Sequence, residues 1–81
     1  MPTVLREGPY RFYFFSHEGK EPAHVHVHRD DRVAKIWLTH VAVAANHGFP
    51  THELSAILRL VREHRASLIE AWDGYFGTGG R

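Results

Sequence analysis

The chain has 81 residues, no cysteine and a formal net charge of +1 with histidine neutral. This composition excludes disulfides and thiolate metal sites, and the balanced charge does not by itself indicate nucleic-acid binding. No apolar run approaches the ~20 residues of a membrane span, and the first residues lack the layout of a secretory signal. We therefore expect a cytoplasmic protein. Because so short a chain buries a modest core, we also expect association to stabilise it.

The first part of the chain predicts β-strands. An extended N-terminal arm is interrupted at Gly8-Pro9, and the aromatic-rich segment that follows has strong strand propensity. Asp30-Asp31 suits a tight turn between two alternating segments, although it lacks the glycine that such turns favour. The predicted strands are Tyr10–Phe15, Val25–Arg29, Val33–Leu38 and a short fourth strand or irregular connection at Val41–Ala44.

The last third predicts one long helix. Thr51 is the expected N-cap, Glu53 favours the positive end of the helix dipole, and Gly74 is the expected stop. Arg65 projects into the apolar stripe, which makes it a candidate for an interface or a carboxylate partner. The stripe comprises Leu54, Ile57, Leu58, Val61, Leu68, Ile69 and Trp72.

These elements predict an α+β fold: a meander of three or four antiparallel strands with one long C-terminal helix packed on one face. We expect a single domain over residues 1–77 and a flexible tail at 78–81. The strands carry large apolar groups on both faces, and the helix covers only one. A second copy or another small protein is therefore expected to cover the other face, through an interface containing Tyr13, Phe15, Trp37 and Arg65.

His24, His26 and His28 alternate with valines, so a strand would place the three imidazoles on one face. Neighbours on that face are ~6.6 Å apart and can share an ion, whereas the outer two are ~13 Å apart and cannot. A divalent metal such as zinc would thus use His24 and His26 with a third ligand from elsewhere. The available candidates are His17, Glu21, His40 and His47.

Two other interpretations of this row stay open. If Asp30-Asp31 forms a two-residue turn, His26 lies opposite Lys35 and His24 opposite Trp37. Two imidazoles and Lys35 could then move a proton and stabilise a phosphate, as in a metal-independent ribonuclease, with His24, His26 and Lys35 as the catalytic candidates. Alternatively, the histidines decorate an interface without chemistry of their own. Whether the protein is an enzyme is left open.

The chain resembles a bacterial and archaeal family of short proteins, the domain of unknown function numbered forty-one-sixty. That resemblance marks His24 and His26 as signature positions and places Lys35 and Trp37 on the next strand, while His28 is outside the signature. It also implies a component of toxin–antitoxin-type gene pairs. The matching segments are Met1-Pro2, Gly8-Pro9-Tyr10-Arg11-Phe12, Glu21-Pro22-Ala23-His24-Val25-His26-Val27, Ala34-Lys35-Ile36-Trp37-Leu38, Gly48-Phe49-Pro50, Glu53-Leu54 and Glu70-Ala71-Trp72.

The leading functional hypothesis is a protein-interaction component of a toxin–antitoxin-like module that forms homo-oligomers or binds a small cognate partner. If it is the toxin, RNA is its expected target. The alternative is a histidine-rich metal-binding protein that uses His24 and His26.

Overall fold

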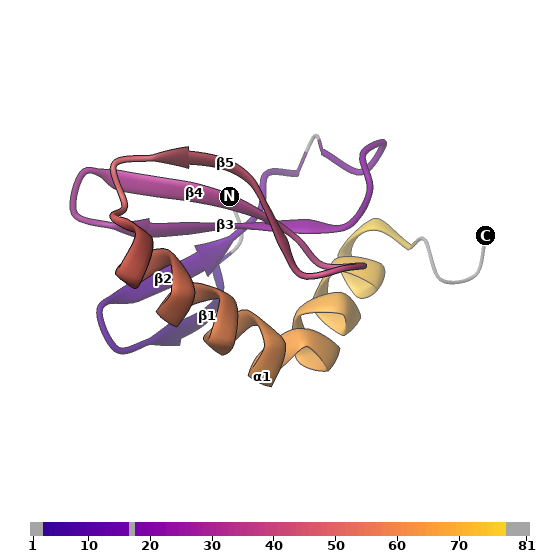
Figure 1. Cartoon of the computed structure of the whole chain (residues 1–81). Helices are drawn as coiled ribbons and strands as arrows, with labels where there is room; N and C mark the ends of the chain where they lie inside the picture. Colours follow the sequence, from indigo (N-terminus) through magenta and orange to yellow (C-terminus); the bar gives the residue numbers. More distant parts are fainter. Residues whose placement is uncertain (1–2, 17, 78–81) are drawn as a thin grey trace.

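The computed structural model describes residues 3–16 and 18–77. Five antiparallel strands form one sheet in the order β1-β2-β3-β4-β5, and one helix follows them (Figure 1). Each strand therefore pairs with its neighbour in sequence, which is a meander. The elements are β1 (Thr3–Glu7), β2 (Tyr10–Tyr13), β3 (His24–Arg29), β4 (Arg32–Trp37), β5 (Ala42–His47) and α1 (Thr51–Phe76).

The predicted α+β meander with a C-terminal helix is confirmed, with five strands instead of three or four. The additional strand is β1, which the sequence suggested only as an extended arm. Gly8 adopts a φ of 57°, which glycine does without steric cost, and the turn that it forms places Glu7 opposite Tyr10. The sequence of β1 does not alternate strictly between polar and apolar residues. This segment is a strand because it pairs with the aromatic strand β2.

Strand β2 is shorter than the predicted Tyr10–Phe15, because the chain leaves the sheet after Tyr13. Phe14 is buried and packs edge-on against Trp72 and Tyr75 of α1, at ring-centroid distances of 5.3 and 5.4 Å. The loop that follows β2 is therefore attached to the C-terminal half of the helix. This attachment brings the loop beside the start of β3.

The hairpin of β3 and β4 has the predicted register, with His24 opposite Trp37 and His26 opposite Lys35. Its turn has no glycine, and Asp30 takes the left-handed conformation with a φ of 56°. Aspartate is one of the few residues other than glycine that tolerate this region.

The helix boundaries differ from the prediction at both ends. Pro50 occupies the N-cap position without a side-chain hydrogen bond, so Thr51 is the first helical residue and not the cap. Gly74 lies inside the helix, which ends at Phe76 and is followed by the C-cap residue Gly77 with a φ of 66°. The extra turn exists because Phe76 packs against Phe14 at 5.3 Å, a tertiary contact that compensates for the low helix propensity of Gly74.

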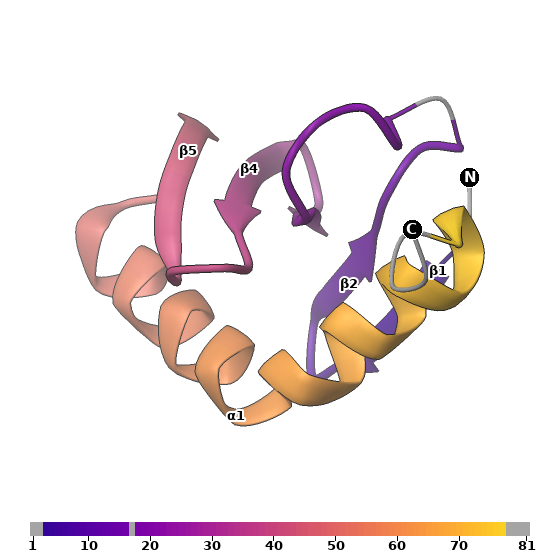
Figure 2. The same ribbon diagram turned by 90° about the vertical axis from the view of Figure 1, so that its right-hand side faces the viewer.

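The core lies between α1 and one face of the sheet. Figure 2 shows that the helix is bent and runs along this face. The opposite face, here called the outer face, carries His26 and Lys35 on its central strands. The fully or nearly buried core residues include Phe12, Val25, Val27, Ala34, Ile36, Ile57, Val61 and Leu68.

Within the described residues, no helix is both long and apolar enough to cross a membrane. The tail predicted at residues 78–81 lies outside the described part of the chain.

Candidate metal centre

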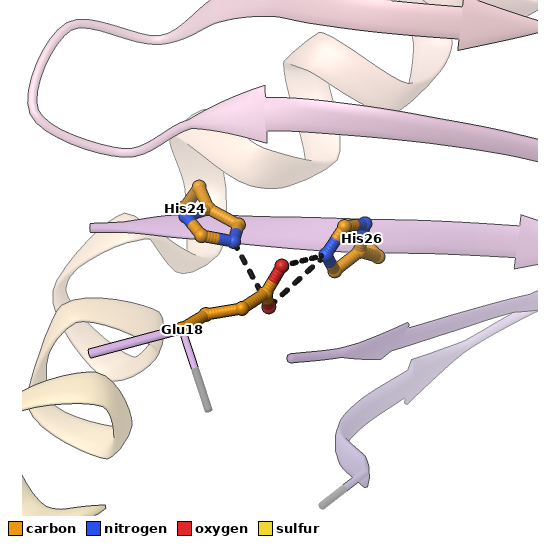
Figure 3. Close-up of side chains that lie close together, drawn as sticks. All are labelled: Glu18, His24 and His26. Carbon is orange, nitrogen blue, oxygen red and sulfur yellow. Dashed lines mark hydrogen bonds and ion pairs between the residues drawn. The ribbon is translucent and has the colours of Figure 1, made fainter. Parts of the chain in front are cut away.

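Three side chains with metal-ligand atoms converge at the start of β3. These are Glu18, His24 and His26, and their ligand atoms all lie within 4.8 Å of one another (Figure 3). The two histidines are neighbours on one face of the strand, while the carboxylate comes from the loop between β2 and β3. Glu18 Oε1 is 3.0 Å from His24 Nε2, and Glu18 Oε2 is 3.0 Å from His26 Nε2. The carboxylate thus lies between the two imidazoles.

Backbone hydrogen bonds in the loop hold Glu18 in this position. The Glu18 N–H donates to the Phe15 carbonyl at 3.1 Å, and the Glu21 N–H donates to the Glu18 carbonyl at 3.1 Å. The Phe15 N–H donates to Glu18 Oε1 at 2.9 Å, so the backbone also orients the carboxylate itself. Gly19 then passes so close to the Phe76 ring that a Cβ there would lie 2.6 Å from Phe76 Cδ1.

His24 is completely buried, and its ring packs against Trp72 at 4.9 Å and Trp37 at 5.8 Å. Its Nδ1 lies 2.9 Å from the Pro22 carbonyl oxygen. A carbonyl only accepts, so Nδ1 carries the proton and the Nε2 of the neutral ring carries a lone pair. Nε2 makes no hydrogen bond within the described residues, although it is 3.0 Å from a carboxylate oxygen. A lone pair facing a carboxylate in a buried site is unfavourable unless a cation lies between them.

Glu18 is an anion at neutral pH. Burial acts against its charge, but the hydrogen bonds from the Phe15 N–H and the His26 imidazole outweigh burial and lower the pKa of Glu18 below its ordinary value. The centre therefore combines one carboxylate with two imidazoles, a donor set that zinc uses in proteins. The hydrogen bond from His24 Nδ1 to a backbone carbonyl is of the kind that orients metal-binding histidines.

Lys35, the third predicted catalytic residue, lies beside this cluster and not within it. Its Nζ donates to Glu21 Oε1 at 2.6 Å and lies 4.8 Å from the centre of the Trp37 ring. Glu21 was a candidate third ligand, but its carboxylate is thus engaged by Lys35.

The other histidines considered as ligands do not join the cluster of described residues. His28, His40 and His47 are absent from it, and His17 lies outside the described residues. For His28, this agrees with the ~13 Å that separates it from His24 along a straight strand.

Sequence reasoning missed Glu18. No spacing rule points to it, because a loop of unknown path separates it from His24. The available signal was weaker: an acidic residue in the loop that leads into the strand of two candidate ligands. That signal applied equally to Glu21, and only the loop conformation distinguishes the two residues.

Of the four predicted interface residues, Tyr13 and Trp37 lie on the outer face of the sheet and Phe15 follows β2, whereas Arg65 lies on α1. Tyr13 is only 7% exposed and stacks on the His26 ring at 5.3 Å, while Phe15 and Trp37 are partly exposed. Arg65 lies on α1, where its Nε donates to the Leu38 carbonyl at 2.7 Å and its Nη2 to the Thr39 carbonyl at 2.9 Å. Arg65 lies at the edge of the apolar stripe because its guanidinium group binds the backbone of the turn between β4 and β5.

Comparison with known proteins gives a match to a family model. A family model described as a domain of unknown function, DUF4160, matches residues 10–73. This range contains Glu18, His24 and His26. Neither the curated proteins nor the solved structures contain a match.

Proposed function

The chain belongs to the DUF4160 family, and we propose that it binds a divalent transition-metal ion, zinc in the first place, through Glu18, His24 and His26. One observation carries the proposal: the buried Nε2 of His24 has no hydrogen-bond partner in the described chain and lies 3.0 Å from a carboxylate oxygen. A cation between these atoms would satisfy both of them.

The donor types favour zinc and its neighbours over magnesium or calcium. Imidazole nitrogen suits zinc, copper, nickel and iron, whereas magnesium and calcium prefer an all-oxygen shell. Three protein ligands also leave a position of tetrahedral zinc for water or a ligand, as in catalytic sites. This arrangement supports metal binding more strongly than metal-independent catalysis, because the Nε2 atoms of both imidazoles face the same carboxylate.

The test is a cobalt(II) and zinc titration of protein that was purified without metal-affinity resin and then treated with chelator. We expect one ion per chain, with visible cobalt absorption typical of a site with nitrogen and oxygen ligands. Replacing one ligand in Glu18→Gln or His26→Asn should weaken zinc binding by about 100-fold or more, since the loss of an outer-shell partner alone costs 10–100-fold.

The matched control is His28→Asn, which changes the next histidine on the same strand face. It should keep the affinity of the parent chain. Circular dichroism would establish that each variant is folded. A folded parent chain that binds no stoichiometric ion, or a His28→Asn variant that loses as much affinity as His26→Asn, would contradict the proposal.

A second candidate function, protein interaction, is favoured by strand β5. This strand contains no charged residue and no proline, and Val43 is 38% exposed. The other edge strand, β1, carries Arg6 and Glu7, and charged residues block edge-to-edge pairing, whereas a register irregularity is present in both edge strands. An uncharged edge can pair antiparallel with a second copy of itself without like-charge contacts.

We therefore propose β5 as the contact through which two copies associate. Light scattering on metal-free protein should give the mass of a dimer, and Ala44→Lys should give the mass of a monomer, whereas Ser67→Lys on α1 should change nothing. A monomeric parent chain would contradict this proposal. The toxin–antitoxin role and the RNA target implied by the family resemblance rest on gene context, and they remain predictions for the same protein.

A further inference from the structure

A groove of about 340 Å³ lies on the outer face directly beside the candidate metal centre. Its walls are mainly apolar and include Phe15 and Val33. Among the described residues, three nitrogen-bearing side chains also line it, namely His26, Lys35 and His47, and no carboxylate does. Its volume is within the range of small-molecule sites. The lining therefore suits a small ligand with an apolar part and a negative charge.

His26 belongs both to this groove and to the metal centre. Its Nε2 faces Glu18, at 3.1 and 3.0 Å from the two carboxylate oxygens, so Nδ1 lies on the other side of the ring (Figure 3). Nδ1 makes no hydrogen bond to any group in the described part of the chain. Lys35 is the direct cross-strand partner of His26 and projects from the same face.

The position of the proton on the His26 ring depends on whether a metal is bound. Without metal, the Glu18 carboxylate accepts a hydrogen bond from Nε2–H, so the Nδ1 of the neutral ring is an acceptor. A metal on Nε2 takes the lone pair of that atom, and the single proton of the neutral ring moves to Nδ1. His26 then changes from an acceptor into a donor. His24 needs no such change, because its Nδ1 already donates to the Pro22 carbonyl.

We propose that the groove binds a small oxyanion, the chemistry shared by phosphate and carboxylate ligands, and that metal bound at Glu18, His24 and His26 strengthens this binding. In the metal-loaded protein, His26 Nδ1–H donates to the anion, and so does the Lys35 ammonium group, which has three N–H donors and uses one of them for Glu21. In the metal-free protein, the Nδ1 lone pair repels it. The inference rests on the proposed function, because the change of tautomer requires the metal.

The experiment titrates inorganic phosphate and, separately, acetate into zinc-free and zinc-loaded protein, with binding followed by NMR. Zinc should tighten oxyanion binding by about fivefold or more, which is the lower end of typical coupling between sites. Long-range ¹H–¹⁵N spectra should show the His26 proton on Nε2 without zinc and on Nδ1 with zinc. Tighter binding of phosphate would indicate a phosphorylated ligand, and tighter binding of acetate a carboxylate ligand.

Lys35→Gln should weaken oxyanion binding about tenfold, the effect of losing one charge-assisted hydrogen bond, while zinc affinity changes little. Lys20→Gln is the matched control, because Lys20 is exposed and lies outside the groove, and it should bind as the parent chain does. If zinc binds but oxyanion affinity is the same with and without it, this inference is wrong and the proposed function stands. If zinc does not bind at all, both are wrong.

Discussion

At the scale of single residues, the two histidines of the candidate metal centre differ in the ring atoms that they leave without a hydrogen bond. His24 is buried with its Nδ1 engaged by the backbone, so its Nε2 is ready to bind a metal. His26 is partly exposed, and its Nε2 is hydrogen-bonded to Glu18. The two imidazoles therefore differ in which ring nitrogen is hydrogen-bonded, because His24 is buried beside the Pro22 carbonyl and His26 is not.

Asp30 is the only non-glycine residue of the described chain with a positive φ, which costs of order 1 kcal/mol or more. Asp30→Gly should therefore raise the free energy of unfolding by about 0.5–1 kcal/mol. Asp30→Val should lower it by about 1–2 kcal/mol, because a branched Cβ clashes in this region.

Urea denaturation measures both changes. Asp31→Gly is the control, since Asp31 has no positive φ and glycine there should only lower stability. Equal effects of glycine at the two positions would show that the left-handed conformation is not the cause. The exposed ion pair from Arg29 to Asp30, at 3.8 Å, contributes little to the comparison.

Glu53 gives stability a dependence on pH. Its carboxylate accepts hydrogen bonds from Tyr10 Oη at 2.9 Å, Arg29 Nη1 at 2.7 Å and Arg32 Nη1 at 3.2 Å. Burial disfavours the charge, but these donors outweigh burial and lower the pKa of Glu53 below its ordinary value of 4.5. A lowered folded-state pKa stabilises the protein above the ordinary value. That contribution is lost as pH falls through the folded-state pKa.

The melting temperature of the parent chain should therefore fall steadily as the pH is lowered from about 5 to 3. Glu53→Gln should lower the melting temperature at pH 7 by roughly 5–10 °C and make it less dependent on pH over this interval, because the variant has no carboxylate there. Glu63→Gln, at an exposed position of the same helix, is the control and should match the parent chain. A Glu53→Gln variant with the parent's pH profile would rule out Glu53 as the source.

At the scale of elements, the loop that carries Glu18 depends on the end of α1. Gly19 lies against the Phe76 ring, which leaves no space for a Cβ. Phe76 also packs on Trp72 at 4.4 Å, and Trp72 in turn contacts His24. The C-terminal end of α1 therefore contacts both the loop that carries Glu18 and the candidate ligand His24, and it fixes the positions of both.

Gly19→Ala should displace this loop and weaken zinc binding about tenfold. All three ligands remain in this variant, but Glu18 no longer lies in its original position. The double variant with Phe76→Ala should recover part of the affinity, because the smaller side chain makes room for the new Cβ. A zinc titration of the two single variants and the double variant measures this coupling. Strictly additive losses would show that contact with Phe76 does not position the loop.

At the scale of the whole molecule, an ion bound at the proposed metal centre would contribute much to the stability of so small a core. Zinc at a free concentration of 100 times its Kd should add about 2.7 kcal/mol to the free energy of unfolding. For a chain of this size, that corresponds to a melting temperature higher by roughly 10 °C or more. Calorimetry with zinc and then with excess chelator measures the change. The same increase in His26→Asn would contradict a specific site.

Local sequence patterns were sufficient to predict the general architecture. Alternating valines and histidines define β3 and its register with β4, and apolar spacing from Leu54 to Trp72 defines the helix, because both depend on which side chains must be buried. The pairing of His24 with His26 as possible ligands follows from strand geometry alone. These are short-range properties, and they need no knowledge of distant contacts.

The third ligand and the element ends depend on contacts between segments that are distant in sequence. Glu18 reaches the histidines because Phe14 and Gly19 attach its loop to α1, and α1 passes Gly74 because Phe76 packs on Phe14. Arg65 and the arm that becomes β1 likewise take their roles from remote partners. Spacing along a chain fixes the faces of its strands and helices, whereas the path of a loop follows from the packing of the elements on either side of it.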